Sequence, residues 1–184
     1  MKKIYLDNAA TTPVYEEVIA AIAESMRAVF GNPSSTHQYG RTAKASIENA
    51  RKKIALQVGA TASEIIFTSG GSEADNLILN NAVENLGVTR IITSQLEHHA
   101  VLNVVEQLKN QQKVAVQYVK TNEDGILDLV DLRALLSSEK DKTLVSLMLV
   151  NNEIGTIIEI EKIGVICKEY KTLFHTDAVQ AVGH

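Results

Sequence analysis

The chain has 184 residues, of which 45% are hydrophobic and 22% are charged, and its formal net charge is -4 at pH 7. This composition is typical of one globular domain or of part of a larger one, and it lacks the basic excess of a nucleic-acid-binding protein. No apolar run is long enough to span a membrane, and no apolar stretch follows the two N-terminal lysines as it would in a secretory signal. We therefore expect a cytoplasmic protein that binds neither nucleic acid nor membrane.

The first third of the chain is predicted to contain helices and loops with little strand. Residues 7–13, DNAATTP, are small, polar and end in proline, which indicates a loop. Val14, Val18 and Ile22 then repeat every four residues, which predicts an amphipathic helix. Apolar residues between 43 and 58 predict a second helix that ends near Gly59.

From Glu64 onward, short apolar runs alternate with helical stretches. This alternation predicts an α/β fold of three layers, in which a mainly parallel sheet has helices on both faces. The run LVSLMLV at 144–150 is apolar on both sides, as a central strand should be. We expect strands near 65–67, 90–94, 115–119, 144–150 and 173–176, and helices near 73–86, 98–111, 128–136 and 160–171.

The stretch EIIFTSGGSEADN at 64–76 combines a predicted strand, a glycine-rich turn and the start of a helix that Ser72 is expected to cap. Backbone N–H groups at such a helix start form a site for a phosphate or a carboxylate, and neither Gly70 nor Gly71 has a side chain to block it. The alternative is that the glycines only allow the chain to bend.

Ligands of parallel sheets bind beyond the carboxyl ends of the strands. Polar residues follow four of the predicted strands there, and each alone has a structural explanation as a helix start, a turn former or a cap. Their convergence favours a shared site, and the residues are Gly70, Gly71 and Ser72, then Glu97, His98 and His99, then Asn151, Asn152 and Glu153, and finally Asp177 and Gln180.

A pyridine ring with a phosphate arm fits this set of side chains. The glycine-rich turn and Ser72 would bind the phosphate, and the Asp177 carboxylate would keep the ring nitrogen protonated. Gln180 could reach the phenolic oxygen, while an imidazole could stack on the ring and move protons. The sequence therefore predicts pyridoxal phosphate as the cofactor.

Six motifs resemble those of the cysteine desulfurases, which are pyridoxal-phosphate enzymes of the class V aminotransferase group with fold type I. The resemblance extends from end to end of the chain. It implies that residues 1–14 form an N-terminal arm with an active-site loop, and that 15–184 form an incomplete, N-terminal part of the cofactor-binding large domain. The motifs are YLDNAATTP at 5–13, GNPSS at 31–35, FTSGGSEADN at 67–76, LEHHAVL at 96–102, VNNEIGT at 150–156 and HTDAVQAVGH at 175–184.

The resemblance also implies a role for individual residues. His98 would be the catalytic histidine that stacks over the ring and assists proton transfer, while His99 would be peripheral. Gly71 and Ser72 would contact the phosphate, at positions where most relatives have alanine and threonine. Asn152 would contact cofactor and substrate, and Asn8 would lie near the substrate entry. Asp177 would contact the ring nitrogen, and Gln180 the phenolic oxygen.

The implied activity is the removal of sulfur from L-cysteine, which gives alanine and a persulfide. A sulfur-acceptor protein would take the sulfur for iron-sulfur cluster or thiocofactor assembly, and the complete enzyme would be a homodimer with its active site near the interface. In the family, the cofactor-binding lysine, the persulfide cysteine and the arginine for the substrate carboxylate all lie beyond the last motif. We therefore expect this chain alone to be inactive. Cys167, its one cysteine, is expected to be a packing residue on a helix.

The resemblance further implies a gap in the sheet. In the family, two strands that come later in the sequence separate the strand near 65–68 from the strand near 173–176, and exposed strand edges invite pairing with another chain. Four interpretations stay open. The chain is the N-terminal half of a cysteine desulfurase, one half of a split enzyme completed by a C-terminal chain, part of a selenocysteine lyase-like relative, or a non-catalytic interaction module.

Overall fold

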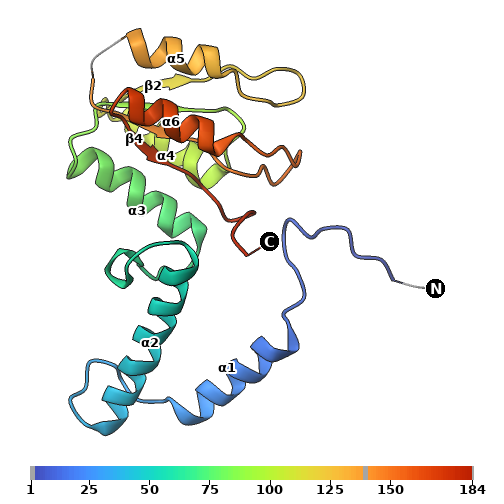
Figure 1. The fold of residues 1–184 in the computed structure, drawn as a ribbon, viewed down its shortest axis with the longest axis vertical. Helices are drawn as coiled ribbons and strands as arrows, with labels where there is room; N and C mark the ends of the chain where they lie inside the picture. The colour runs from blue at the N-terminus through green and yellow to red at the C-terminus, as the bar shows by residue number, and fades with distance from the viewer. Residues whose placement is uncertain (1–2, 139–140, 184) are drawn as a thin grey trace. The chain divides into compact units, whose positions relative to one another are not determined.

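The computed structural model describes residues 3–138 and 141–183 (Figure 1). The chain divides into two compact units, Met1–Phe67 and Thr68–His184. The predicted division at residue 14 stays a prediction.

The first unit consists of helices and loops, as expected. Helix α1 spans Glu16–Ala28, α2 spans Gln38–Gln57, and a short 3-10 helix, η1, spans Ala62–Glu64. The predicted end of α2 near Gly59 is confirmed, since the helix ends at Gln57. Gly59 has a φ of 68°, which glycine adopts without strain, and the Ala60 N–H donates to the Ala55 carbonyl over 2.9 Å.

The strand predicted at 65–67 is wrong. Ile65 has an extended backbone, with φ -92° and ψ 122°, but the segment belongs to no sheet of the described residues. Ile66 is 69% exposed. The Arg51 guanidinium of α2 donates to the Ile65 carbonyl and lies 4.8 Å from the centre of the Phe67 ring. Residues with high strand propensity make the backbone extended, but a strand also needs a neighbour to pair with, and no described strand pairs with this segment.

The second unit contains a parallel sheet of four strands in the order β2-β1-β3-β4. The strands are β1 (Arg90–Thr93), β2 (Ala115–Tyr118), β3 (Thr143–Ser146) and β4 (Leu173–His175). Every pair of neighbours is parallel, which confirms the predicted sheet. The strand predicted at 144–150 ends earlier, at Ser146. The N–H groups of Leu147 and Leu149 still donate to the carbonyls of His175 and Asp177, so the chain remains beside the segment that follows β4.

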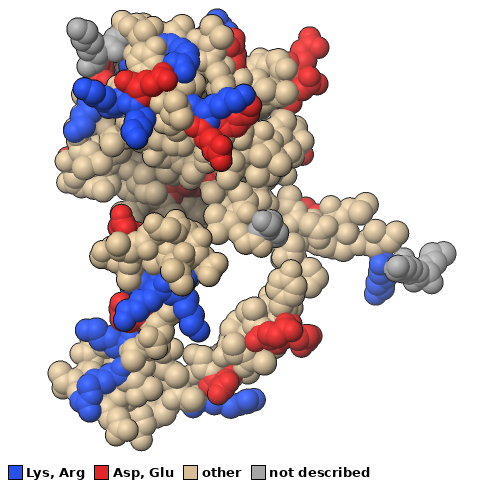
Figure 2. Space-filling view, in the orientation of Figure 1, with Lys and Arg blue, Asp and Glu red and all other residues tan. Residues whose placement is uncertain are grey.

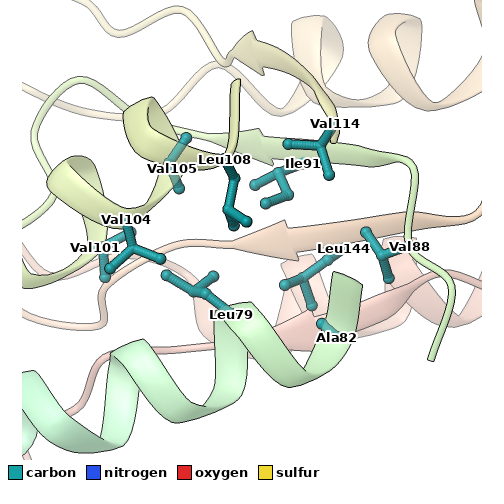
Figure 3. Packing of buried hydrophobic residues seen from close by; sticks show 10 residues of the cluster. All are labelled: Leu79, Ala82, Val88, Ile91, Val101, Val104, Val105, Leu108, Val114 and Leu144. Atoms are coloured by element: carbon teal, nitrogen blue, oxygen red, sulfur yellow. The ribbon is translucent and has the colours of Figure 1, made fainter. Parts of the chain in front are cut away.

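Helices cover both faces of this sheet, which confirms the three-layer prediction (Figure 1). On one face lie α3 (Gly71–Glu84) and α4 (His99–Asn110), and on the other lie α5 (Leu129–Ser138) and α6 (Ile160–Glu169). Adjacent residues of one strand point to opposite faces, so Ile91 joins one core and Ile92 the other. Figure 3 shows the first core, which consists of Leu79, Ala82, Val88, Ile91, Val101, Val104, Val105, Leu108, Val114 and Leu144.

The second core lies between the sheet, α5 and α6, and it contains Cys167. All of its buried members are less than 5% exposed, and they are Ile92, Val119, Leu132, Leu136, Val145, Leu147, Ile163, Ile166 and Cys167. The Arg133–Glu169 ion pair connects the same two helices at the surface. Acidic and basic side chains are interspersed on the face shown in Figure 2. Exposed pairs contribute about 1 kcal/mol or less each, so the stability of this layer depends on the apolar core.

No helix in the described part of the chain is both long enough and apolar enough to cross a membrane.

The second core provides a direct test of this packing. We expect Ile163→Ala to lower the free energy of unfolding by about 2–4 kcal/mol, because it leaves a cavity next to the sheet. Val165→Ala is the matched control on the same helix, since Val165 is 57% exposed, and its effect should be about 0.5 kcal/mol or less. Urea denaturation monitored by circular dichroism measures both. Equal losses in the two variants would contradict the assignment of this helix face to the core.

Candidate functional site

The candidate residues follow three strands and lie at one edge of the sheet. His98 follows β1, Asn152 follows β3, and Asp177 follows β4. Since β1, β3 and β4 are parallel neighbours, their carboxyl ends lie at the same edge. The prediction that these three residues share one edge of the sheet is confirmed.

His98 and Asn152 line one cavity of about 160 Å³, together with Glu97, Asn151, Leu102 and Ile154. Asn151 is buried and shapes the wall of this cavity. Its amide donates to the Leu96 carbonyl over 2.6 Å, and its side-chain oxygen accepts from the N–H groups of Glu153 and Ile154, each over 2.9 Å. Asn151 thus holds the turn after β3, and this turn places Asn152 at the cavity.

His98 caps the N-terminus of α4. Its Nδ1 accepts a hydrogen bond from the Ala100 N–H over 3.1 Å. An accepting Nδ1 has no proton, so the neutral ring carries its proton on Nε2. The ring is exposed, and its centre lies 6.0 Å from the centre of the neighbouring His99 ring. This cap fixes which nitrogen of His98 can exchange protons with a ligand.

The N-terminus of α3 is open. The helix begins at Gly71 with Gly70 as its N-cap, and no side chain of the described residues caps it. The prediction that Ser72 is the cap is wrong, because Ser72 lies inside the first turn. Glu73 instead accepts from the backbone N–H and the hydroxyl of Ser69, each over 2.6 Å, and these hydrogen bonds lower the pKa of Glu73. The first backbone N–H groups of α3 therefore present the positive end of the helix dipole to an anion.

Gly71 lies against the turn that follows β4. A Cβ atom at this position would be 2.6 Å from Cγ2 of Val179. The glycine therefore permits a close approach between the start of α3 and the turn that carries Asp177, whereas the alanine implied by the resemblance would require Val179 to move.

Three carboxyl groups are buried below this edge. Asp75 is 4% exposed, while Glu97 and Asp177 are each 6% exposed. One oxygen of Asp177 accepts from the Val179 N–H over 2.9 Å, and one oxygen of Glu97 accepts from the Ser94 hydroxyl over 2.9 Å. Among the described residues, Oδ2 of Asp75 and Oε2 of Glu97 have no hydrogen-bond partner. Unsatisfied buried carboxylate oxygens are costly, so their presence points to a function of this edge.

Burial, followed by the charges of Asp177 and Asp75, raises the pKa of Glu97 to about 7 against the opposing effects of the Met148 backbone and the Ser94 hydroxyl. The site thus carries an excess of buried negative charge. A protonated ring nitrogen beside Asp177 would offset this charge, and the open turn of α3 could accept a phosphate. The residues present therefore fit pyridoxal phosphate.

The sequence prediction did not select Asp75 or His175 as site residues, and it gave Glu97 no individual role within the predicted site. The available signal for Asp75 was helical spacing, because Asp75, Leu79 and Ala82 lie on one side of α3 and all three are buried. Glu97 immediately precedes His98, and the sequence identifies it only as one of several polar residues that follow a predicted strand. No local signal marks His175, since it is the last residue of a short strand.

Cys167 lies on α6 and is 2% exposed, and burial raises the pKa of its thiol. A buried thiol with a raised pKa is a poor nucleophile. The prediction that Cys167 is a packing residue is confirmed.

Comparison with known proteins identifies the family. The model of the family described as aminotransferase class-V matches residues 4–184. The chain belongs to this family. Its members depend on pyridoxal phosphate.

The chain is similar over its whole length to cysteine desulfurases. It is 45% identical to cysteine desulfurase IscS of Dictyoglomus turgidum and 46% identical to cysteine desulfurase IscS of Methanosarcina thermophila, covering 46% and 45% of these proteins. Among solved structures, a NifS-like protein superposes with a TM-score of 0.93 at 38% identity, and the match covers 99% of this chain and 50% of the other. The structure described as SspA in complex with cysteine has a TM-score of 0.87 at 34% identity, with 51% of that chain covered. The chain thus spans about half the length of the relatives it matches.

The raised pKa of Glu97 predicts a pH dependence of stability. In the unfolded chain the carboxyl has its ordinary pKa of 4.5, and in the folded chain its pKa is about 7. Between these values the folded state binds more protons, so the contribution of Glu97 to stability is present at pH 4.5 and is lost as the pH rises to about 7. The loss should be at most about 1.4 kcal/mol per pH unit.

Glu97→Gln cannot titrate, so the difference in free energy of unfolding between the unaltered chain and this variant should fall across that window. Urea denaturation at pH 4.5, 5.5, 6.5 and 7.5 measures the difference. Glu123→Gln, at an exposed loop position, is the control and should give a difference that barely changes with pH. A constant difference for Glu97→Gln would contradict the raised pKa.

Proposed function

We propose that this chain provides part of the active site of a cysteine desulfurase, which removes sulfur from L-cysteine with pyridoxal phosphate as cofactor. The observation that supports this proposal best is the convergence at one sheet edge of the open α3 turn, the cavity of His98 and Asn152, and the buried Asp177. The similarity to cysteine desulfurases along the whole chain supports the same activity.

The cofactor would be held at two ends. The backbone N–H groups of Gly71 and Ser72, together with the Ser72 hydroxyl, would donate to the phosphate. The Asp177 carboxylate would accept from the protonated ring nitrogen, and the Gln180 amide would contact the phenolic oxygen. When bound, pyridoxal phosphate supplies an electron sink for bonds broken at the α-carbon of an amino acid.

His98 is proposed as the residue that moves protons. Its Nδ1 is engaged by the Ala100 N–H, so Nε2 is the nitrogen available to give or take a proton at the substrate. Asn152 shares the cavity with His98 and is proposed to contact both cofactor and substrate. The assignment of Asn8 to the substrate entry rests on the resemblance alone.

The wider setting of the activity is part of the proposal. A persulfide would pass to a sulfur-acceptor protein for iron-sulfur cluster or thiocofactor assembly, and the complete enzyme would be a cytoplasmic homodimer. The groups that complete the reaction, a cofactor-binding lysine and a persulfide cysteine, would come from a segment additional to these 184 residues or from a complementary chain.

Asp177→Asn tests the cofactor site. We expect it to weaken pyridoxal phosphate binding tenfold or more, because a charge-assisted hydrogen bond contributes about 1.5–3 kcal/mol. Equilibrium titration followed by the absorption of the bound cofactor gives the Kd, and circular dichroism confirms folding. Asp124→Asn, on an exposed loop, is the control and should leave the Kd unchanged. Equal Kd values for the two variants would remove Asp177 from the site.

A complementation assay tests the activity. We expect this chain, mixed with L-cysteine and pyridoxal phosphate, to form no alanine or sulfide, and to form both once a separately produced C-terminal half of a cysteine desulfurase is added. The Cys167→Ala variant should behave like the unaltered chain in the complemented assay, since its thiol is buried. Turnover by the chain alone would refute this expectation.

A further inference from the structure

A buried polar chain of three side chains crosses from α3 to the sheet. Nε2 of His175 lies 3.4 Å from Oδ1 of Asp75, and its Nδ1 lies 2.9 Å from the Ser146 hydroxyl. The side chains of His175 and Asp75 are 7% and 6% exposed, and Ser146 is fully buried. Both ring nitrogens of His175 therefore have a polar neighbour, with a carboxylate facing Nε2 and a hydroxyl facing Nδ1.

This polar chain connects the two halves of the cofactor site. Asp75 lies about one turn along α3 from Gly71 and Ser72, and His175 is the last residue of β4, just before Asp177. A second contact joins the same two segments, because Gly71 lies directly against Val179. The turn proposed to bind the phosphate and the turn that carries Asp177 are thus held together by one polar contact and one apolar contact.

A charged group is a costly means of packing a helix onto a sheet. Leu79, the next residue on the same face of α3, is fully buried and packs the helix with apolar contacts alone. Asp75 instead places a carboxylate in the interior and leaves its Oδ2 without a hydrogen-bond partner among the described residues. Replacement of buried ion pairs by apolar residues is often neutral or stabilising, so packing alone does not account for this aspartate.

We propose that Asp75 and His175 are positioning residues for the cofactor: their contact sets the separation between the α3 turn and Asp177. This inference rests on the proposed function. The phosphate and the ring nitrogen of one cofactor molecule are a fixed distance apart, so the groups that bind them must be held at a matching distance. An error of about 1 Å in such a placement is costly for binding and catalysis.

The test compares three variants of the chain. Asp75→Ala removes the contact, and Asp75→Asn keeps an oxygen that can accept from His175. Leu79→Ala is the matched control, since it weakens the packing of the same helix without touching the polar chain. For each variant, titration with pyridoxal phosphate gives the Kd, ³¹P NMR gives the chemical shift of the bound phosphate, and urea denaturation gives the stability.

We expect Asp75→Ala to weaken binding about tenfold, the size typical of losing a partner that orients a ligand-binding group, and to shift the ³¹P signal. Asp75→Asn should recover most of the affinity. Leu79→Ala should be the less stable protein, with a Kd within about twofold of the unaltered chain. The proposal is overturned if Asp75→Ala binds as well as the unaltered chain, or if Leu79→Ala weakens binding equally.

A measurement without cofactor separates this proposal from the proposed function. In ¹⁵N NMR spectra of the free protein, Asp75→Ala should shift the backbone amide signals of Asp177 and Val179 across the contact, and Leu79→Ala should leave them in place. If the unaltered chain does not bind pyridoxal phosphate, the proposed function fails, while unshifted amide signals in Asp75→Ala would overturn the positioning role. Should Asp75→Ala fail to fold, Ser146→Ala removes the hydroxyl beside Nδ1 and is expected to give the same changes at smaller size.

Discussion

Parallel pairing of β1, β3 and β4 is the constraint on which the rest of the site depends. In a parallel sheet every strand ends at the same edge, so the segments that follow β1, β3 and β4 must all begin there. His98, Asn152 and Asp177 are distant in the sequence and yet meet for this reason. The apolar residues on both faces of the sheet maintain the pairing, because Ile91 and Leu144 pack under α3 and α4 while Ile92 and Val145 pack under α5 and α6.

Burial of negative charge is the second property of this edge. Asp75, Glu97 and Asp177 are all buried, and desolvation, followed by the charges of the other two carboxylates, raises the pKa of Glu97. A protonated Glu97 is uncharged, so its protonation near neutral pH reduces the negative charge at this edge. The charge of this edge thus favours a ligand with a cationic ring nitrogen, while the α3 turn, at the positive end of a helix dipole, favours an anion. Pyridoxal phosphate combines both groups in one molecule.

The prediction from sequence was right for structural features that depend on residues close together in the chain. It failed for features that depend on contacts between residues far apart in the chain. The alternation after Glu64 predicted the four parallel strands and their helices, and Gly59 marked the end of α2 because a positive φ is a local requirement. The strand at 65–67 was wrong because its formation depends on a partner strand. Ser72 was wrongly expected to be a cap, since Gly70 and Gly71 allow the helix to begin earlier. Asp75 and His175 were missed because helical spacing indicates only that Asp75 is buried, and no neighbouring residue indicates that it contacts His175.

The missed contact shows where the precision of such a site originates. The sheet brings the α3 turn and Asp177 to the same edge, but strand order alone does not fix the spacing between a helix and the turn beside it. Two contacts fix it here: Gly71 allows the backbone of α3 to approach Val179, and Asp75 faces His175 inside the protein. A side chain at position 71 acts against the first contact, and an apolar residue at position 75 removes the second. Contacts between protein groups thus determine how well the ligand-binding residues match the length of the cofactor.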